Sequence, residues 1–339
     1  MIYKALALQV TCRAINQLKT KEEVKAHIQR EIQRIGAQIK ASISFIGKDV
    51  KLVVLPEYFL TGFPMGESIE SWRYKACIDP DGEAYQQLGQ LAQENSLYLC
   101  GNAYETDRHF PNLYFQCSFI IAPSGDVILR YRRLNSMFAP TPHDVWEKYL
   151  DIYGLENVFP VVKTDIGNLA CIASEEILYP EIARCFAMRG AEIFLHNTSE
   201  IGSPMLTQKN VAKLARAIEN MAYVVSANSA GIEGTPIPMA STDGGSKIIN
   251  YNGLVLAEAG YGESMVANAE IDLHALRHFR RRPGMGNFLA RQRFELYAQS
   301  YAEHSFYPPN TLLAQEPDRG HFMHMQALVI ERLEKIGVL

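Results

Sequence analysis

One stripe of apolar side chains near the start of the chain constrains the fold more than any other feature of the sequence. Its members recur at steps of four and three: Val24, Ile28, Ile32, Ile35, Ile39, Ile43 and Ile46. That spacing predicts a long helix with one apolar face. Thr20, with Glu23 three residues later, provides a capping box for the start of the helix. This helix is the first of several that alternate with strands.

Apolar runs of strand length follow this helix along the chain. Residues 51–55, Lys-Leu-Val-Val-Leu, end at Pro56. Two further runs at 113–122 and 126–132 are joined by Pro-Ser-Gly-Asp, which predicts a hairpin. Other strands are expected at the N-terminus and at 97–104, 159–163, 168–173, 191–196, 223–228, 245–250, 254–258 and 265–270. Other helices are expected at 83–95, 180–189 and 208–222.

The mixture of hairpins and helix-separated strands predicts an α/β fold of a layered kind. Helices pack outside two face-to-face sheets, which makes a four-layer α-β-β-α sandwich. The mixture continues without a linker-like break to about residue 280. We therefore expect one domain over residues 1–282. Residues 283–339 form a less regular C-terminal extension, a candidate oligomerisation arm.

Composition and charge exclude several classes of function. The 33 basic and 37 acidic side chains give a net charge of −4, so we expect no nucleic-acid partner. No run approaches the roughly 18 uninterrupted apolar residues of a membrane span, so we expect no membrane partner. The N-terminus reads as a strand rather than a secretory signal, and the six cysteines are scattered as in a reduced core. A cytoplasmic location is therefore expected.

Residues that carry chemistry lie in three short stretches. Glu57 follows an apolar strand directly, where α/β sheets gather their ligands, and burial there suits a general base. Cationic side chains close a later strand in Arg-Tyr-Arg-Arg at 130–133. Ser174 follows the strand at 168–173 and precedes a helix that begins at Pro180. A carboxylate, a cation and a hydroxyl are thus the candidate reactive groups.

In this order the three stretches resemble the nitrilase superfamily of carbon-nitrogen hydrolases. The matching positions are Glu57 and Gly62 of a Leu-Pro-Glu-x-x-x-x-Gly pattern, Arg133, Ser174, and the Pro180-Glu181 pair six residues after it. The family has lysine where Arg133 stands and cysteine where Ser174 stands. The resemblance covers about residues 3–280. It implies the same sandwich fold, a small-molecule ligand, and a homodimer or higher homo-oligomer.

In the scheme that this resemblance implies, the glutamate takes the thiol proton, the thiolate attacks a nitrile or amide carbon, and the lysine stabilises the oxyanion. A thiol with a pKa of about 8.5 is within reach of such a base, whereas a serine hydroxyl is far harder to ionise. No motif places a histidine or lysine beside Ser174. Arg133 either stabilises an oxyanion or clamps Glu57 in a bidentate ion pair that leaves no base.

Two functions therefore stay open, and with them the question whether the chain is an enzyme. In the first, thiol-based hydrolysis is weak or lost, and the pocket binds a small amide, nitrile or carbamoyl ligand. In the second, the chain is an active amidase-like or nitrilase-like hydrolase that uses Ser174 or altered chemistry. An engineered serine would account for Ser174 but not for Arg133.

Four residues near the three stretches are candidate substrate-binding residues: Tyr58, Glu175, Glu176 and His143. The two glutamates either pair with Arg132 and Arg133 or bind a cationic ligand. His143 belongs to the run 140–146, which either resembles a loop of nitrile-acting members of the family or is the capped start of a helix with Trp146 in the core. The sequence gives no sign of a metal or an organic cofactor, so none is expected.

Overall fold

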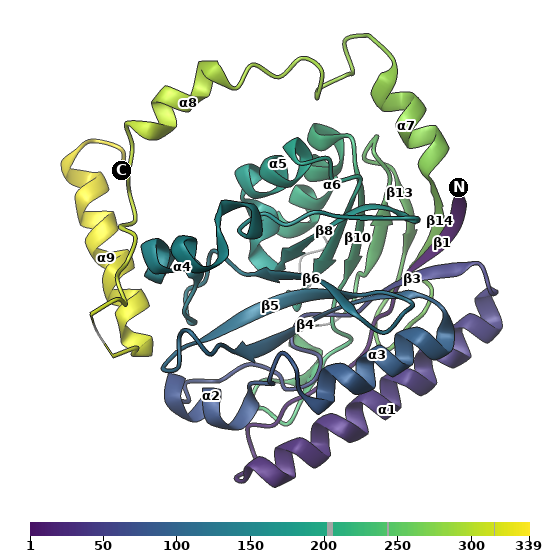
Figure 1. Cartoon of the computed structure of the whole chain (residues 1–339), viewed down its shortest axis with the longest axis horizontal. Coiled ribbons are helices and arrows are strands. Elements are labelled where there is room, and N and C mark those ends of the chain that lie inside the picture. The colour runs from purple at the N-terminus through teal and green to yellow at the C-terminus, as the bar shows by residue number, and fades with distance from the viewer. Residues whose placement is uncertain (202–205, 243, 315) are drawn as a thin grey trace.

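The chain folds into two six-stranded sheets that face each other, with helices on both outer faces (Figure 1). The computed structural model describes residues 1–201, 206–242, 244–314 and 316–339. The predicted four-layer α-β-β-α sandwich is therefore confirmed.

The first sheet has the strand order β14-β1-β3-β4-β5-β6. Its strands are β1 (Ile2–Ala7), β3 (Val50–Val54), β4 (Tyr98–Thr106), β5 (Tyr114–Ile121), β6 (Val127–Arg132) and β14 (Asn268–Asp272). The strands β1, β3 and β4 run parallel, whereas β14, β5 and β6 are antiparallel to their neighbours. The predicted hairpin is the β5–β6 pair.

The second sheet has the strand order β13-β12-β10-β9-β8-β7. Its strands are β7 (Val162–Thr164), β8 (Gly167–Ala173), β9 (Ile193–Asn197), β10 (Tyr223–Ala227), β12 (Lys247–Ile249) and β13 (Val255–Glu258). The central strands β8, β9 and β10 are parallel, so their carboxyl ends meet at one edge. Two short strands, β2 (Cys12–Arg13) and β11 (Ile232–Glu233), pair outside both sheets.

The helices of the described residues are α1 (Lys21–Ile46), α2 (Ile69–Ala76), α3 (Glu83–Asn95), α4 (Trp146–Tyr153), α5 (Pro180–Met188), α6 (Gln208–Asn220), α7 (Leu273–Arg281), α8 (Glu295–Ala302) and α9 (Arg319–Lys335). Helices α1, α3, α5 and α6 form the outer layers, and the other helices lie at the ends of the sandwich or on the C-terminal segment. Helices α1 and α3 cover the first sheet, and α5 and α6 cover the second (Figure 1). The capping box predicted at Thr20 and Glu23 is present. Within the described residues, no helix is both long enough and apolar enough to span a bilayer.

The strand β3 shows why the central runs of the sequence are almost wholly apolar. Leu52 and Val54 pack toward the second sheet, whereas Val53 and Leu55 pack against the helical layer that contains Ile32 of α1. A strand that is buried on both faces reads as a continuous apolar run. The isoleucine stripe of α1 covers the outer of these two faces.

The C-terminal part of the chain is more regular than predicted. A less regular extension was expected after residue 282, whereas the structure has both α8 and α9 there. In Figure 1 this segment leaves the sheets after α7, passes around the sandwich and returns near α4. At its return the Leu312 amide donates to the Asp144 carbonyl over 2.9 Å, and Phe322 is buried. Helix α2 was not predicted either, because eight residues carry too short an apolar pattern, whereas α4 follows the capped helix start expected at 140–146.

Ile35→Ala should lower the free energy of unfolding by about 2–5 kcal/mol, because this buried side chain fills the space between α1 and the first sheet. Phe45→Ala is the matched control on the same helix. Phe45 is 81% exposed, so its loss should change stability by no more than about 0.5 kcal/mol. Urea titrations measure both variants. Equal losses would contradict the assignment of the stripe to the core.

Candidate functional site

The three predicted stretches come together where the two sheets end side by side. Asn197, at the end of β9, donates from Nδ2 to the Leu55 carbonyl after β3 over 2.7 Å, which ties one sheet to the other. The carboxyl ends of the central parallel strands lie at this edge. Glu57, Arg133 and Ser174 consequently line one cavity.

Glu57 is fully buried in a turn that its neighbours shape. Tyr58 has a φ of 35°, and its amide donates to Asn102 Oδ1 over 3.2 Å. Gly62 closes the turn with a φ of 69°, and its amide donates to the Tyr58 carbonyl over 2.9 Å. A Cβ at position 62 would stand 2.7 Å from Ala14 Cβ, which explains the glycine of the predicted pattern.

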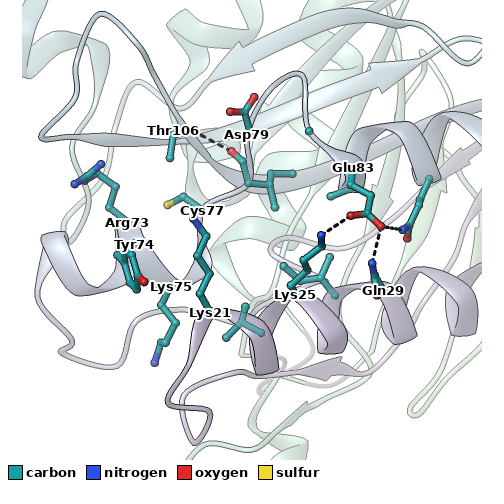
Figure 2. Close-up of a pocket in the computed structure, with 16 residues that line it drawn as sticks. Lys21, Lys25, Gln29, Arg73, Tyr74, Lys75, Cys77, Asp79, Glu83 and Thr106 are labelled. Carbon is teal, nitrogen blue, oxygen red and sulfur yellow. Dashed lines mark hydrogen bonds and ion pairs between the residues drawn. The ribbon is translucent and has the colours of Figure 1, made fainter.

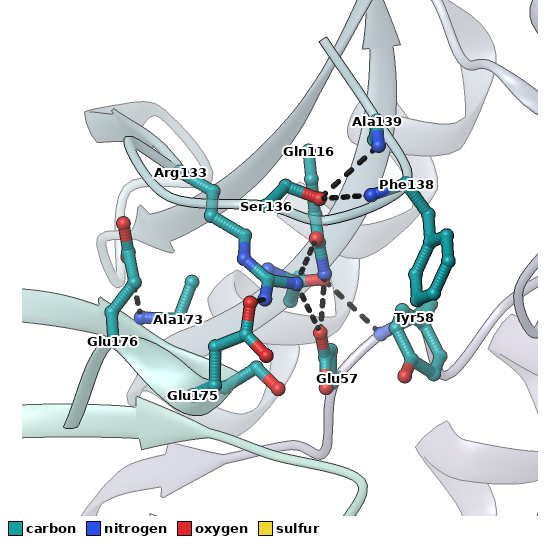
Figure 3. A network of polar contacts seen from close by, with 12 residues as sticks. Glu57, Tyr58, Gln116, Arg133, Ser136, Phe138, Ala139, Ala173, Glu175 and Glu176 are labelled. Carbon is teal, nitrogen blue, oxygen red and sulfur yellow. Dashed lines mark hydrogen bonds and ion pairs between the residues drawn. The ribbon is translucent and has the colours of Figure 1, made fainter. Parts of the chain in front are cut away.

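Arg133 connects Glu57 to the second sheet through a polar network (Figure 3). Its Nη1 donates to Glu57 Oε1 over 3.2 Å and to Gln116 Oε1 over 2.9 Å. Its Nη2 donates to Glu175, and its Nε donates to the Asn135 carbonyl over 2.6 Å. Burial alone lowers the pKa of Arg133, but the Glu175 and Glu57 carboxylates outweigh it and raise this pKa above its usual value. The guanidinium is therefore a permanent cation.

The contact with Glu57 differs from the predicted bidentate clamp. Gln116 Nε2 donates to Glu57 Oε1 over 2.7 Å, so Gln116 and Arg133 share one carboxylate oxygen. The other oxygen, Oε2, accepts no hydrogen bond from the described residues. Buried oxygens without a partner are rare. Glu57 thus keeps one hydrogen-bond acceptor on the cavity wall.

The predicted pairing of Glu175 and Glu176 with Arg132 and Arg133 is correct for one of the two glutamates. Glu175 pairs with Arg133. Arg132 instead pairs with Asp107, and Glu176 forms no ion pair with either arginine in the described part of the chain. The pairing predicted for Glu176 is wrong, because its oxygens are taken by neutral donors.

Glu176 fixes the loop that carries Arg133. Its carboxyl accepts from the Tyr131 hydroxyl over 2.7 Å and from the amides of Leu134 and Asn135 over 2.6 and 3.1 Å. Burial raises the pKa of Glu176 to about 7, although Arg133 and these hydrogen bonds lower it. This carboxyl therefore titrates well above the usual range for glutamate.

Ser174 has a backbone conformation that is rare for a residue with a side chain. Its φ is 51°, at the junction between β8 and a 3-10 turn over Ser174–Leu178. Strained positions of this kind cluster at active sites. His196 Nε2 lies 2.8 Å from the Ser174 carbonyl and donates to it, because a carbonyl only accepts, while Nδ1 accepts from the Ser226 hydroxyl over 2.9 Å. Burial lowers the pKa of His196 well below its usual value, so a neutral ring holds the backbone of Ser174.

An amine lies beside the Ser174 hydroxyl. Lys209 Nζ donates to Ser174 Oγ over 3.4 Å, a long and weak hydrogen bond. Lys209 comes from the first turn of α6, 35 residues further along the chain. The sequence-based expectation that no lysine or histidine nitrogen approaches this hydroxyl is wrong.

A cavity of about 1230 Å³ lies over these groups. Its apolar wall includes Tyr58, Phe63, Tyr104, Met137, Phe138 and Leu206. Its polar side chains include Glu57, Arg133, Ser174, Glu175, Glu200, Lys209 and Arg319. A large concave surface that is mostly apolar, with a few convergent polar groups, is typical of a small-molecule site.

Two of the four predicted substrate-binding residues lie on this wall. Tyr58 and Glu175 line the cavity, whereas His143 and Glu176 do not. The His143 ring lies 6.1 Å, between ring centroids, from both Trp146 and Tyr307. We therefore retain neither His143 nor Glu176 as a ligand contact.

The polar residues of the site that were not predicted include Gln116, Glu200, Lys209 and Arg319. Gln116 could have been found, because it is a polar residue inside the buried strand β5. The other three have no local signal. Their places depend on how α6 and α9 return to the sheets.

A smaller cavity of about 340 Å³ lies between α1 and the segment of α2 and α3 (Figure 2). Two of its lysines are already paired: Lys25 with Glu83 and Lys75 with Glu67, each over 2.7 Å. No described residue of the three predicted stretches lines it. The larger cavity is therefore the candidate functional site.

Comparison with known proteins bears on the family and the fold. The sequence profile described as carbon-nitrogen hydrolase matches residues 9–281. The chain is 28% identical over 239 residues to a 2-oxoglutaramate amidase of Bacillus subtilis, which covers 69% of this chain and 84% of that protein. It is 26% identical over 234 residues to a nitrilase of Pyrococcus abyssi, which covers 68% of this chain and 80% of that protein. A solved carbon-nitrogen hydrolase from Helicobacter pylori G27 is 20% identical, with a TM-score of 0.67 over 89% of this chain and 99% of that chain.

The contribution of Glu176 to stability should decrease as the pH rises from about 4.5 to about 7. In this window the unfolded chain has lost the proton while the folded chain keeps it, because the folded pKa is about 7 and the ordinary value is 4.5. The stability lost across the window is about 3 kcal/mol.

Urea titrations across this pH range, on the wild type and on Glu176→Gln, measure the effect. The free energy of unfolding of the wild type should fall relative to that of Glu176→Gln, which cannot titrate. Glu22→Gln, at an exposed position on α1, is the control and should follow the wild type. Parallel curves for the wild type and Glu176→Gln would contradict the raised pKa.

Proposed function

Because the chain belongs to the carbon-nitrogen hydrolase family, we propose that its large cavity binds a small amide, nitrile or carbamoyl ligand and that thiol-based hydrolysis is lost. The observation that carries this proposal is the bonding of Arg133. This residue stands at the family's lysine position and gives four hydrogen bonds to the protein itself. Because its N–H groups are already bonded to protein acceptors, this guanidinium has few donors for a developing oxyanion.

The nucleophile position supports the same conclusion. A serine hydroxyl is far harder to ionise than a thiol with a pKa of about 8.5. Arg133 and Gln116 both donate to Oε1 of Glu57, so one oxygen of the carboxylate is already occupied. Two of the three reactive groups of the family scheme are thus changed, and the third is partly occupied.

The unpaired oxygen of Glu57 favours a ligand with an N–H group. Oε2 is buried and accepts no hydrogen bond from the described residues, and a primary amide would supply a donor. The aromatic rings of Tyr58 and Tyr104 would cover the apolar part of the ligand.

Acyl transfer to serine is the second candidate, and the approach of Lys209 favours it. A neutral Lys209 would take the hydroxyl proton while Ser174 Oγ forms a bond to the acyl carbon. The C–N bond would then break, the proton would pass to the leaving nitrogen, and water would later hydrolyse the ester. This route requires an uncharged Lys209, because an ammonium only donates to Oγ.

The double variant Ser174→Cys with Arg133→Lys should regain hydrolysis of simple amides, because it restores two side chains of the family scheme beside Glu57. The unchanged protein should bind the same amides without releasing ammonia. Calorimetry measures binding, and an ammonia assay measures hydrolysis. Arg133→Lys alone is the matched control and should stay inactive. The proposal fails if the unchanged protein binds no member of a panel of amides, nitriles and carbamoyl compounds.

Mass spectrometry separates the two candidate functions. After incubation with the same panel, the wild type should carry no added mass on Ser174, because no strong base is available to a hydroxyl beside an ammonium. An adduct that disappears in Ser174→Ala and in Lys209→Met would instead establish the second candidate.

A homodimer or higher homo-oligomer, with residues 283–339 as an arm, stays a prediction, as does the cytoplasmic location. The arm is supported by the apolar side chains that α8 exposes. Leu296, Tyr297 and Tyr301 are 65%, 51% and 62% exposed, and large apolar side chains gathered on one short helix are typical of a protein interface.

A further inference from the structure

The charged groups around the large cavity are unevenly paired. Among the described residues, the wall carries three carboxylates, and each of them has a cation. The pairs are Glu57 and Glu175 with Arg133, and Glu200 with the buried Lys213. Two cations of the wall, Lys209 and Arg319, have no carboxylate partner within the part of the chain that the structure describes. The described part of the wall itself carries three cations and three carboxylates, and with the buried Lys213 behind it four cations stand against three carboxylates.

Lys209 is the unpaired cation beside the reactive position. Its Nζ donates to the Ser174 hydroxyl over 3.4 Å, and a neutral hydroxyl does not offset its charge. Ser174 Oγ accepts this bond, so it keeps its own proton for another acceptor. The two side chains together offer an N–H and an O–H donor to one ligand group.

The start of α6 adds to this positive potential. Thr207 caps the helix, and its side chain accepts from the Asn210 amide over 3.1 Å. Thr207, Gln208 and Lys209 all line the cavity. The first turn of a 13-residue helix favours a negative charge beside it, because its peptide dipoles are aligned.

Arg319 brings the second unpaired charge from the far end of the chain. Its guanidinium donates to the carbonyls of Glu67 and Phe138 and to the Tyr114 hydroxyl, the last over 3.0 Å. All three acceptors are neutral, because burial raises the pKa of Tyr114 above its usual value even though Arg319 lowers it. The side chain is thus fixed in place without losing its charge.

We propose that the ligand of this cavity carries a carboxylate, which Lys209 Nζ and the Ser174 hydroxyl hold at the start of α6. The inference rests on the proposed function and specifies its ligand, a small amide that also has one carboxylate. One negative charge suits this wall, whereas a phosphate dianion would be repelled by the carboxylates of Glu57, Glu175 and Glu200. Lys209 stays charged in this arrangement, so it is an anchor for the ligand and not a base for Ser174.

Succinamate and succinamide are a matched pair of probes. Both carry an amide at one end. At the other end succinamate has a carboxylate, whereas succinamide has a second amide. Calorimetry should show succinamate binding at least about tenfold more tightly, because the carboxylate gains a charged hydrogen bond. Glutaramate and glutaramide extend the pair by one methylene group, and the same preference should appear at the length that spans Glu57 and Lys209.

Three variants assign the preference to Lys209. Lys209→Met should reduce the ratio of the two affinities to less than about threefold, and Lys209→Arg should keep it. Lys25→Met is the control, because Lys25 lines the smaller cavity and pairs with Glu83 over 2.7 Å. It should leave the ratio unchanged. Thermal melts establish that each variant is folded.

The outcomes separate this inference from the proposed function. If the unchanged protein binds succinamate and succinamide equally, and glutaramate and glutaramide equally, the proposal that the ligand carries a carboxylate is overturned. The proposed function then stays in place. A preference that persists in a folded Lys209→Met would overturn the role of Lys209. Binding of none of these probes, together with no binding of any amide, nitrile or carbamoyl compound, would overturn the proposed function itself.

Discussion

The guanidinium of Arg133 holds together the region where the two sheets meet. It bonds to Glu57 and Gln116 of the first sheet and to Glu175 after β8 of the second. The planar fork of an arginine reaches both sides at once, which the single nitrogen of a lysine does not. Removing one partner from a buried ion pair of this kind costs about 3–5 kcal/mol, because a charge is left without compensation. Under the proposed function, the position that carries catalytic charge in the family scheme is here part of the framework.

Surrounding residues hold Ser174 in a strained backbone conformation. Its φ is 51°, and the neutral His196 and the buried Glu176 hold the elements on both sides of it. Strain of about 1–3 kcal/mol persists only when the surroundings fix it. Under the proposed function, the hydroxyl in this position and the neighbouring Lys209 Nζ serve to recognise the ligand.

The sequence predicts those features that depend on local patterns. The start of α1 follows from Thr20 and Glu23, and β3 follows from one apolar run, because each needs only neighbours in the chain or one buried face. Motif spacing likewise brings Glu57 and Ser174 to one cavity. Each of these predictions rests on a local pattern or on the spacing of a motif along the chain.

The features that escaped prediction all depend on tertiary packing. Lys209 reaches Ser174 only because α6 packs beside the end of β8, and no residue near Lys209 in the sequence signals this. The ring of His143 lies against Trp146 and Tyr307, away from the cavity, although its surrounding run resembles a ligand loop. Apart from the Tyr131 hydroxyl, the partners of Glu176 are backbone amides, which leave no trace in the side-chain pattern.

The return of α9 gives the cavity an order of assembly. Arg319 and Gly320 belong to the wall, although the segment that matches the family ends at residue 281. During synthesis on the ribosome, the strands of both sheets emerge before this arginine does. The pocket is therefore the last part of the sandwich to be completed. Proteolysis between α7 and α9 that removes α9 would leave both sheets intact but would take Arg319 and Gly320 out of the cavity wall.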